Sequence, residues 1–204
     1  MNTRHKGPAG LPQGRFRFVA LDVETANGSS ASICQIGLAA VTDEARIVTW
    51  SSVIDPRCAF SPFNIQLHGI GPDQVRGAPG FEQVLAWLEP LLASQPVIQH
   101  SSFDRRAVAG ACEALGREAP TWRWGDSVLI ARRAWPEFIG NGGHGLAHLK
   151  RQLDLQFEHH DAGEDARAAA EVVLRAEART GRAFDALLGW VRPLAAQGAD
   201  SLTA

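Results

Sequence analysis

Residues Arg15–Thr25 read RFRFVALDVET. Their apolar residues first alternate with polar ones and then become continuous, which is typical of a strand that enters a sheet covered on both faces. A turn, NGSS, separates this run from ASICQIGLAAVT (31–42), and TDE forms the turn before ARIVTWSSVID (45–55). The pattern predicts three consecutive strands that pair as a meander.

Helical patterns follow the third strand and are interrupted by a short apolar run, QPVIQH (95–100). Residues 60–75, which lie between the third strand and the first helical segment, are expected to form a loop. Because the helical segments alternate with short strands, we expect an α/β fold in which crossover connections extend the meander. The predicted helices span residues 80–92, 103–116, 126–135, 146–153, 164–181 and 183–196.

The composition is that of an ordinary globular protein. The chain has 204 residues, 45% of them apolar and 21% charged, which is enough for one domain with a sizeable core. It contains no apolar run long enough to cross a membrane. Its first residues lack the apolar stretch of a secretion signal, so we do not expect one there. We expect residues 1–14 to be a disordered arm, residues 15–192 to form the domain and residues 193–204 to be a tail.

Cysteine content and charge bound the environment and the partners. Cys34, Cys58 and Cys112 are widely spaced and odd in number, which favours reduced thiols and a cytoplasmic location. The formal net charge is −2, so no global charge indicates a polyanionic partner. Any contact with nucleic acid must therefore be local or helped by bound cations.

Two acids end the first predicted strand. Asp22 and Glu24 are separated by one residue, so on a strand both side chains point to the same face. Two neighbouring carboxylates repel each other, and in a covered sheet they need a compensating proton, arginine or cation. The alternative interpretation is that the strand has ended by Asp22 and that both acids are solvated.

Two more acids lie at predicted helix starts. Asp104 follows the run 95–100, and Asp165 lies near the start of the alanine-rich helix, just after His159 and His160. Either acid alone could simply complement a helix N-terminus. Taken together, the acids supply the hard oxygen ligands that suit magnesium or manganese better than zinc.

Five segments occur in an order that resembles a known family. They are LDVETANGSSASICQIGLAAV, IQLHGI, QHSSFD, GDSVLIARRAWP and HDAGEDA. The chain is similar, from Phe16 to Arg179, to the DEDDh-type 3′→5′ exonucleases, the family of the proofreading epsilon subunit of bacterial DNA polymerase III, its stand-alone relatives and ribonuclease T. The resemblance implies a ribonuclease-H-like fold with a mixed five-stranded sheet, the second strand antiparallel, flanked by helices.

The resemblance also implies a set of roles. Asp22, Glu24, Asp104 and Asp165 would hold two Mg²⁺ or Mn²⁺ ions, which can together activate water and stabilise the leaving oxygen. His160, rather than His159, would be the general base, because the family motif places this histidine five residues before the last aspartate.

The implied reaction is removal of nucleoside 5′-monophosphates from 3′ ends of single-stranded or frayed DNA, as in proofreading or repair. Thr25, His68 and Phe103 are candidate substrate contacts, and Ile70 is a candidate wedge against the base. Phe103 could equally be a core residue, and His68 a hydrogen-bonded loop histidine. Two alternative functions remain open: an exonuclease for RNA ends or oligoribonucleotides, and a polymerase-associated accessory subunit with little activity.

Other features carry less weight. Ser101 stands where relatives usually have Asn, and Gly163 is expected to loosen the start of its helix. Asp126 with Ser127 is expected to cap a helix. The segment GNGGHG (140–145) lacks the preceding strand of a dinucleotide-binding site, so we expect a flexible surface loop there, with His144 and His148 exposed.

Overall fold

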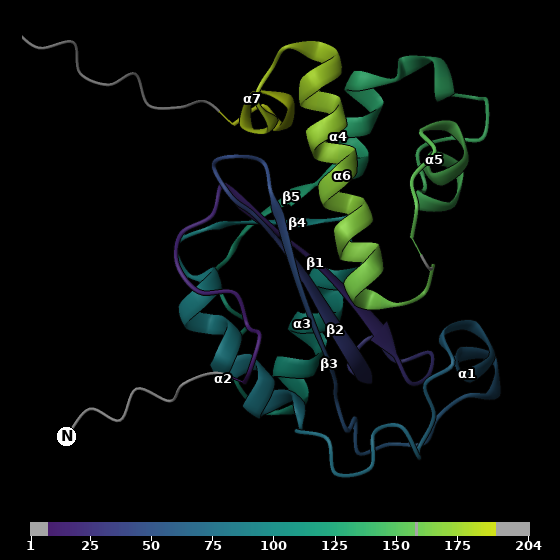
Figure 1. Ribbon diagram of the computed structural model, residues 1–204. Coiled ribbons are helices and arrows are strands. Elements are labelled where there is room, and N and C mark those ends of the chain that lie inside the picture. The colour runs from purple at the N-terminus through teal and green to yellow at the C-terminus, as the bar shows by residue number, and fades with distance from the viewer. Residues whose placement is uncertain (1–7, 158, 191–204) are drawn as a thin grey trace, which may run out of the picture.

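The computed structural model describes residues 8–157 and 159–190. Its centre is a five-stranded sheet with the order β3-β2-β1-β4-β5 (Figure 1). β2 is antiparallel to both β1 and β3, whereas β4 is parallel to β1 and to β5. The predicted mixed sheet and its opening meander are thereby confirmed. The strands are β1 (Phe18–Thr25), β2 (Ile33–Val41), β3 (Ile47–Val53), β4 (Pro96–Gln99) and β5 (Arg123–Asp126).

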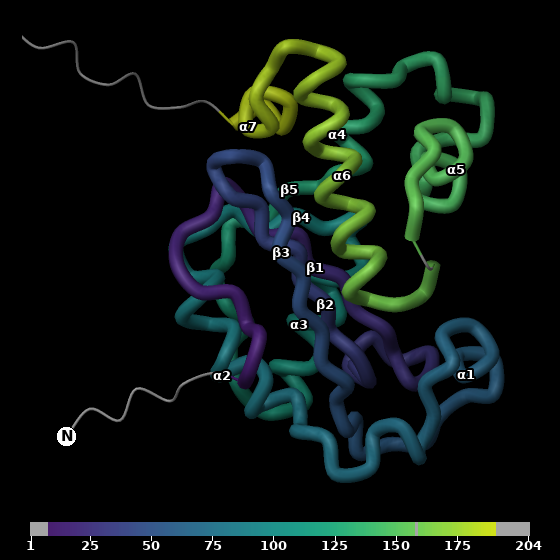
Figure 2. Tube along the Cα trace, in the orientation of Figure 1, coloured from purple at the N-terminus to yellow at the C-terminus, as the bar shows by residue number. Residues whose placement is uncertain are grey.

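Helices cover both faces of this sheet (Figures 1 and 2). One face packs against α4 (Ser127–Ala134), α6 (Ala162–Thr180) and α7 (Phe184–Leu188). The other face packs against α2 (Phe81–Leu92) and α3 (Phe103–Ala114). The other helices are α1 (Pro62–His68), α5 (Leu146–Gln152) and a 3₁₀ turn at Pro136–Phe138.

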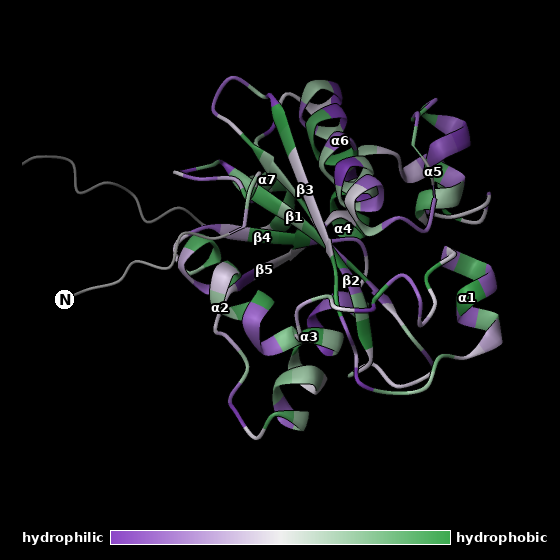
Figure 3. Ribbon diagram, turned by 60° about the horizontal axis from the view of Figure 1, so that its bottom comes forward, coloured by the Kyte–Doolittle hydropathy of each residue, from purple (hydrophilic) through white to green (hydrophobic). Residues whose placement is uncertain are grey.

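Alternate residues of β1 serve the two cores. Phe18 and Ala20 pack on the α6 side, whereas Val19, Leu21 and Val23 pack on the α3 side. Because a strand has a side-chain period of two, the side that holds Phe18 and Ala20 is also the side of the acids at 22 and 24. Burial on both faces explains the continuous apolar run in the sequence and the green colour of β1 in Figure 3.

Three segments differ from the sequence-based expectations. The stretch 60–75 contains the helix α1, which has no buried residue and therefore no amphipathic signal. β5 is only four residues long and half polar, so no strand pattern was visible in it. The helix expected over 183–196 ends at Leu188, because Gly189 adopts a left-handed φ of 76°; its remainder from 191 onward lies outside the described residues.

The segments at both ends of the domain fall partly within the described residues. Leu11, which belongs to the expected N-terminal arm, is 6% exposed and packs with the α3-side core. Residues 1–7 of that arm and the tail 193–204 lie outside the described ranges. None of the described helices combines the length and hydropathy needed to cross a bilayer.

The first turn of α6 lies directly on β2. A Cβ atom added to Gly37 would lie 2.1 Å from the carbonyl carbon and oxygen of Ala162 and 2.3 Å from the nitrogen of Gly163. Gly163 itself is buried, and its Cβ would lie 3.2 Å from the Cβ of Ser51 on β3. Gly163 therefore permits close packing of the helix start, and the expectation that it loosens this start stays a prediction.

We predict that Gly37→Ala will lower the free energy of unfolding by about 1–3 kcal/mol or more, because backbone atoms, rather than a flexible side-chain end, oppose the new methyl group. Gly28→Ala is the matched control, since its Cβ would meet nothing within 4 Å. Urea unfolding of both variants measures the difference. Equal stabilities would contradict the close approach of α6 to β2.

Candidate active site

Two acids of β1 project toward the start of α6. Asp22 pairs in register with Gly37 of β2, and Glu24 pairs with Gln35. Asp22 is partly buried and Glu24 is 8% exposed. The strand continues through both residues and has its irregularity only between Glu24 and Thr25. The alternative of a strand that ends before the acids is therefore excluded.

The other two acids come from the first turns of helices. Asp104 is 2% exposed in α3, and its Oδ1 accepts a hydrogen bond of 3.1 Å from the backbone N–H of Val23. Asp165 is 4% exposed in α6. Carboxylate oxygens of Asp22, Glu24 and Asp165 all lie within 4.8 Å of one another. We call Asp22, Glu24, Asp104 and Asp165 the carboxylate group.

The carboxylate group carries mutually repelling charges. Burial, and then the charges of Asp104 and Asp165, raise the pKa of Asp22 well above its usual value. Burial, followed by Asp165 and Asp104, raises the pKa of Glu24 to about 8. Among the described residues, no arginine or lysine forms an ion pair with any of the four acids.

The pKa of Asp104 is also raised, but backbone hydrogen bonds partly oppose the effect of burial. Burial raises its pKa to about 7, although hydrogen bonds from the backbone N–H groups of Val23 and of Asp104 itself act in the opposite direction. Buried carboxylates of this kind are stable as anions only beside a compensating positive charge. Oxygen donors gathered in this way fit divalent cations such as Mg²⁺ or Mn²⁺.

A network at the start of α6 positions Asp165. Asp161 is the N-cap residue, and its Oδ1 accepts from the N–H of Glu164 at 3.0 Å. The Gln35 side chain donates to Oδ2 of Asp161 at 2.9 Å and accepts from the N–H of Ala162 at 3.1 Å. Sequence reasoning missed Gln35 and Asp161, although an acid three residues before Glu164 is a recognisable capping signal.

Two histidines lie beside Asp165. His160 has a left-handed φ of 71°, and its backbone N–H donates to Oδ2 of Asp165 at 3.0 Å. Nδ1 of His159 lies 2.9 Å from Oδ1 and 3.1 Å from Oδ2 of the same aspartate. The two imidazole rings stack with centroids 4.1 Å apart and planes 11° apart. Burial, and then the neighbouring His159, lower the pKa of His160.

The contact between His159 and Asp165 was missed at the sequence level. The family motif has its histidine five residues before the last aspartate, which identifies His160, so no role was assigned to His159. The only indication in the sequence that His159 also lies at the site was its position next to His160. In the structure both histidines are half-buried and both reach the same carboxylate.

The candidate substrate residues border the end of β1. Nε2 of His68 lies 3.1 Å from the carbonyl oxygen of Thr25, and Nδ1 accepts from the N–H of Ile70 at 3.1 Å. Asn64 also donates to the oxygen of Thr25, at 2.8 Å. Both nitrogens of His68 are therefore occupied, which leaves the ring itself for any substrate contact. Phe103 is half-buried at the first position of α3 and packs at the edge of the core.

The predicted cap at Asp126 is confirmed. Its side chain accepts from the N–H of Val128 at 2.8 Å and from that of Ser101 at 3.2 Å. Ser101 has a left-handed φ of 89°. This backbone conformation is uncommon for residues other than glycine, asparagine and aspartate.

The expectation of exposed histidines at 144 and 148 is wrong. His144 is 6% exposed, and its Nε2 lies 2.8 Å from the carbonyl oxygen of Trp135. His148 is 9% exposed on α5, and its ring lies edge-on to Phe138. Left-handed Gly142 approaches the ring of His148 so closely that a Cβ there would lie 2.1 Å from it. Because Gly142 has no side chain, the loop can pack directly against the ring of His148.

The sheet order is that of the ribonuclease-H-like fold. Acids near the end of β1 and at the starts of two helices are the arrangement expected of a nuclease with this fold. A family model of exonucleases, RNase_T, matches residues 19–173, which is more than half of the chain. The chain therefore belongs to this exonuclease family, and its resemblance to the DEDDh-type 3′→5′ exonucleases is confirmed.

Individual relatives agree with this assignment. The chain is 28% identical over 160 residues to "DNA polymerase III PolC-type" of Streptococcus suis, an alignment that covers 76% of this chain and 11% of that protein. The chain therefore spans only about a tenth of the length of this relative.

Two solved structures share the fold. One is "Exonuclease X in complex with 5' overhanging duplex DNA", with a TM-score of 0.68 and 23% identity over 85% of this chain and 98% of that one. The other is titled "3'-end specific recognition of histone mRNA stem-loop by 3'-exonuclease", with a TM-score of 0.62 and 16% identity over 79% and 82% of the two chains.

Without divalent cations, we predict that the free energy of unfolding falls as the pH rises from 5 to about 8. The folded-state pKa values of Glu24 and Asp104 are raised to about 8 and about 7, whereas the unfolded chain loses these protons near about pH 4. The protonated acids are compatible with the folded state, so their contribution to its stability is fully present below the unfolded-state pKa values. This contribution is lost as the pH rises through the folded-state pKa values, because the acids then become charged in the folded chain. Each kcal/mol lost lowers Tm by about 2–4 °C for a chain of this size.

Thermal unfolding in chelator across this pH range measures the effect. Mg²⁺ added at pH 8 should raise Tm, because a cation that binds the native carboxylates stabilises that state. Glu24→Gln should show a weaker pH dependence in chelator. A Tm that rises between pH 6 and pH 8 in chelator would show that the acids are not electrostatically strained.

Proposed function

We propose that the chain is a divalent-metal-dependent 3′→5′ exonuclease that acts on single-stranded or frayed DNA ends and releases nucleoside 5′-monophosphates. One observation carries the proposal: four carboxylates, three of them no more than 8% exposed, lie near one another beside an imidazole pair, and no arginine or lysine among the described residues pairs with them. An arrangement that leaves negative charge uncompensated is costly for folding alone and useful for gathering cations.

The carboxylate group fits the cofactor. Asp22, Glu24 and Asp165 offer oxygens close enough together for one shared cation, and Asp104 lies near enough to influence the charge of Asp22 and Glu24. When bound, two Mg²⁺ or Mn²⁺ ions would neutralise the phosphodiester and acidify a water molecule. Hard oxygen donors of this kind suit these ions.

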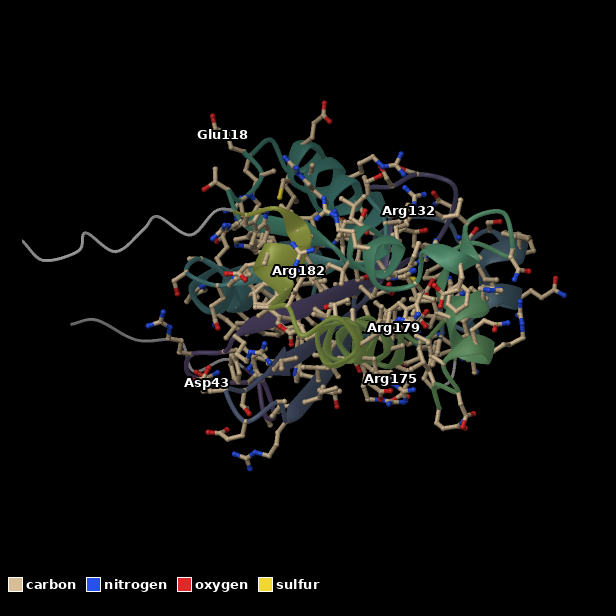
Figure 4. The ribbon with its side chains drawn as sticks, turned by 90° about the horizontal axis from the view of Figure 1, so that it is seen from above. Asp43, Glu118, Arg132, Arg175, Arg179 and Arg182 are labelled. Carbon is tan, nitrogen blue, oxygen red and sulfur yellow. The ribbon has the colours of Figure 1, made fainter. Side chains whose placement is uncertain are left out.

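One arginine of α6, Arg179, lies far from the carboxylate group. Figure 4, which views the molecule from above, labels Arg132 of α4, Arg175 and Arg179 of α6, and Arg182 between α6 and α7. Asp165 and Arg179 lie at opposite ends of α6, about 21 Å apart along its axis at 1.5 Å per residue. Arg179 is therefore too far from the carboxylate group to neutralise a substrate held there, a role that bound cations would fill.

His160 is assigned the proton-accepting role. It is half-buried, its backbone N–H bonds to Asp165, and its lowered pKa keeps the imidazole unprotonated near neutral pH. Thr25 ends β1, His68 contacts it and Phe103 begins α3, and these three residues are assigned to the terminal nucleotide. An aromatic face such as that of Phe103 stacks on any base, which suits a sequence-independent nuclease.

DNA is the favoured substrate because the solved relative with the higher TM-score of the two is titled as a complex with duplex DNA, and the curated relative is named as a DNA polymerase. The latter name also makes a polymerase a candidate partner. The relative titled for histone mRNA keeps RNA ends as the second candidate substrate. The distinction depends on contacts to the 2′-hydroxyl.

Nuclease assays on the purified chain test the proposal. We predict that 3′-labelled single-stranded DNA is shortened with Mg²⁺ or Mn²⁺ and is stable in chelator. Asp22→Asn should abolish turnover, and His160→Ala should lower kcat by about 10²–10⁴-fold, the usual contribution of a general base. Asp154→Asn, an exposed acid outside the site, is the control and should keep the activity.

Matched DNA and RNA oligomers, offered separately and in competition, distinguish the two substrates by kcat/KM. Full activity of Asp22→Asn would refute the proposed role of the carboxylate group. An absence of turnover on every oligomer, combined with tight binding to a polymerase, would favour the accessory-subunit function instead.

A further inference from the structure

His159, His160 and Asp165 form a group of ligands that differs in chemistry from the carboxylate group. One ligand atom from each residue lies within 4.8 Å of the other two. Nδ1 of His159 already lies 2.9 Å from Oδ1 of Asp165. The group therefore offers two imidazole nitrogens and one oxygen, and it shares Asp165 with the all-oxygen set of Asp22, Glu24 and Asp165.

The backbone at His160 brings the two rings together. Neighbouring side chains of an extended chain point to opposite sides, but His160 has a left-handed φ of 71°. Its ring instead stacks on that of His159, with planes 11° apart. The side chain of His159 is 31% exposed, whereas that of Asp165 is 5% exposed. The group thus opens to solvent on its imidazole side.

Ligand chemistry decides which ions this group selects. Imidazole nitrogen suits Zn²⁺ and similar transition metals, whereas carboxylate oxygens suit Mg²⁺ and Mn²⁺. Zn²⁺ binds nitrogen at about 2.0–2.1 Å in a tetrahedral arrangement, which places neighbouring ligand atoms about 3.3 Å apart. The pair formed by His159 and Asp165 already approaches that spacing, whereas the half-buried His160 ring has to turn out of its stack on His159 to direct a nitrogen at the same ion.

We propose that His159, His160 and Asp165 form an inhibitory site for Zn²⁺ or a similar transition-metal ion. An ion held there withdraws Asp165 from the all-oxygen set and occupies the imidazole of His160. The inhibitory consequence rests on the proposed function, whereas the binding of the ion does not.

Zinc binding to the full chain is measured first, by isothermal titration with millimolar Mg²⁺ present, and visible absorption of Co²⁺ reports the coordination. His159→Ala should weaken Zn²⁺ binding at least about tenfold, because loss of even a partner of a metal ligand costs roughly 10–100-fold in affinity. His159→Phe keeps a ring against His160 and removes the nitrogen, so it should weaken binding equally. Glu164→Gln, an acid of the same helical turn outside the group, should bind Zn²⁺ as the unaltered chain does.

Inhibition is then measured for each variant against its own Mg²⁺-supported rate on 3′-labelled DNA. The half-inhibiting Zn²⁺ concentration should rise at least tenfold in both His159 variants and stay unchanged in Glu164→Gln, in line with the lost ligand. Unchanged Zn²⁺ affinity in both His159 variants, or no binding by the unaltered chain, would overturn the site. If the chain has no nuclease activity, the proposed function fails while the zinc titration still decides this inference.

Discussion

The close contact between α6 and β2 determines the geometry of the site. Gly37 leaves no side chain between the strand and the helix, and the amide of Gln35 bonds to both Asp161 and the N–H of Ala162. These contacts fix the first turn of α6 above the acids of β1. Asp165 lies near Asp22 because the backbones of α6 and β2 are closer together at Gly37 than a side chain at that position would permit.

The same contact creates the electrostatic repulsion that the proposed metal-dependent chemistry would use. It brings a third carboxylate to two that already share one face of a strand, in a region with little solvent. Two apolar cores, one on each side of the sheet, provide the stability that tolerates this repulsion. A rigid scaffold of this kind holds acids in place before any cation arrives, which lowers the reorganisation needed for binding.

Much of the architecture could be predicted from local patterns. The apolar run of β1, the turn before β3 and the caps at Asp126 and Gly181 are encoded by nearby residues. α1 gave no amphipathic signal, since it buries no residue and exposes 70% of Phe63, and the capping signals of Ser61, Pro62 and Gly69 were missed. The burial of His144 and His148 was also not visible, because it depends on how a glycine loop folds over α5.

The sequence by itself determined which chemical groups are present and which face of β1 carries Asp22 and Glu24, since strand periodicity settles that face locally. It also determined the family, through ordered motifs. Only the tertiary structure decided that Asp165 meets those acids and that His159 joins His160 beside it. Those contacts depend on a helix seated against a glycine and on one left-handed residue, and neither the helix placement nor that φ angle follows from a local sequence pattern.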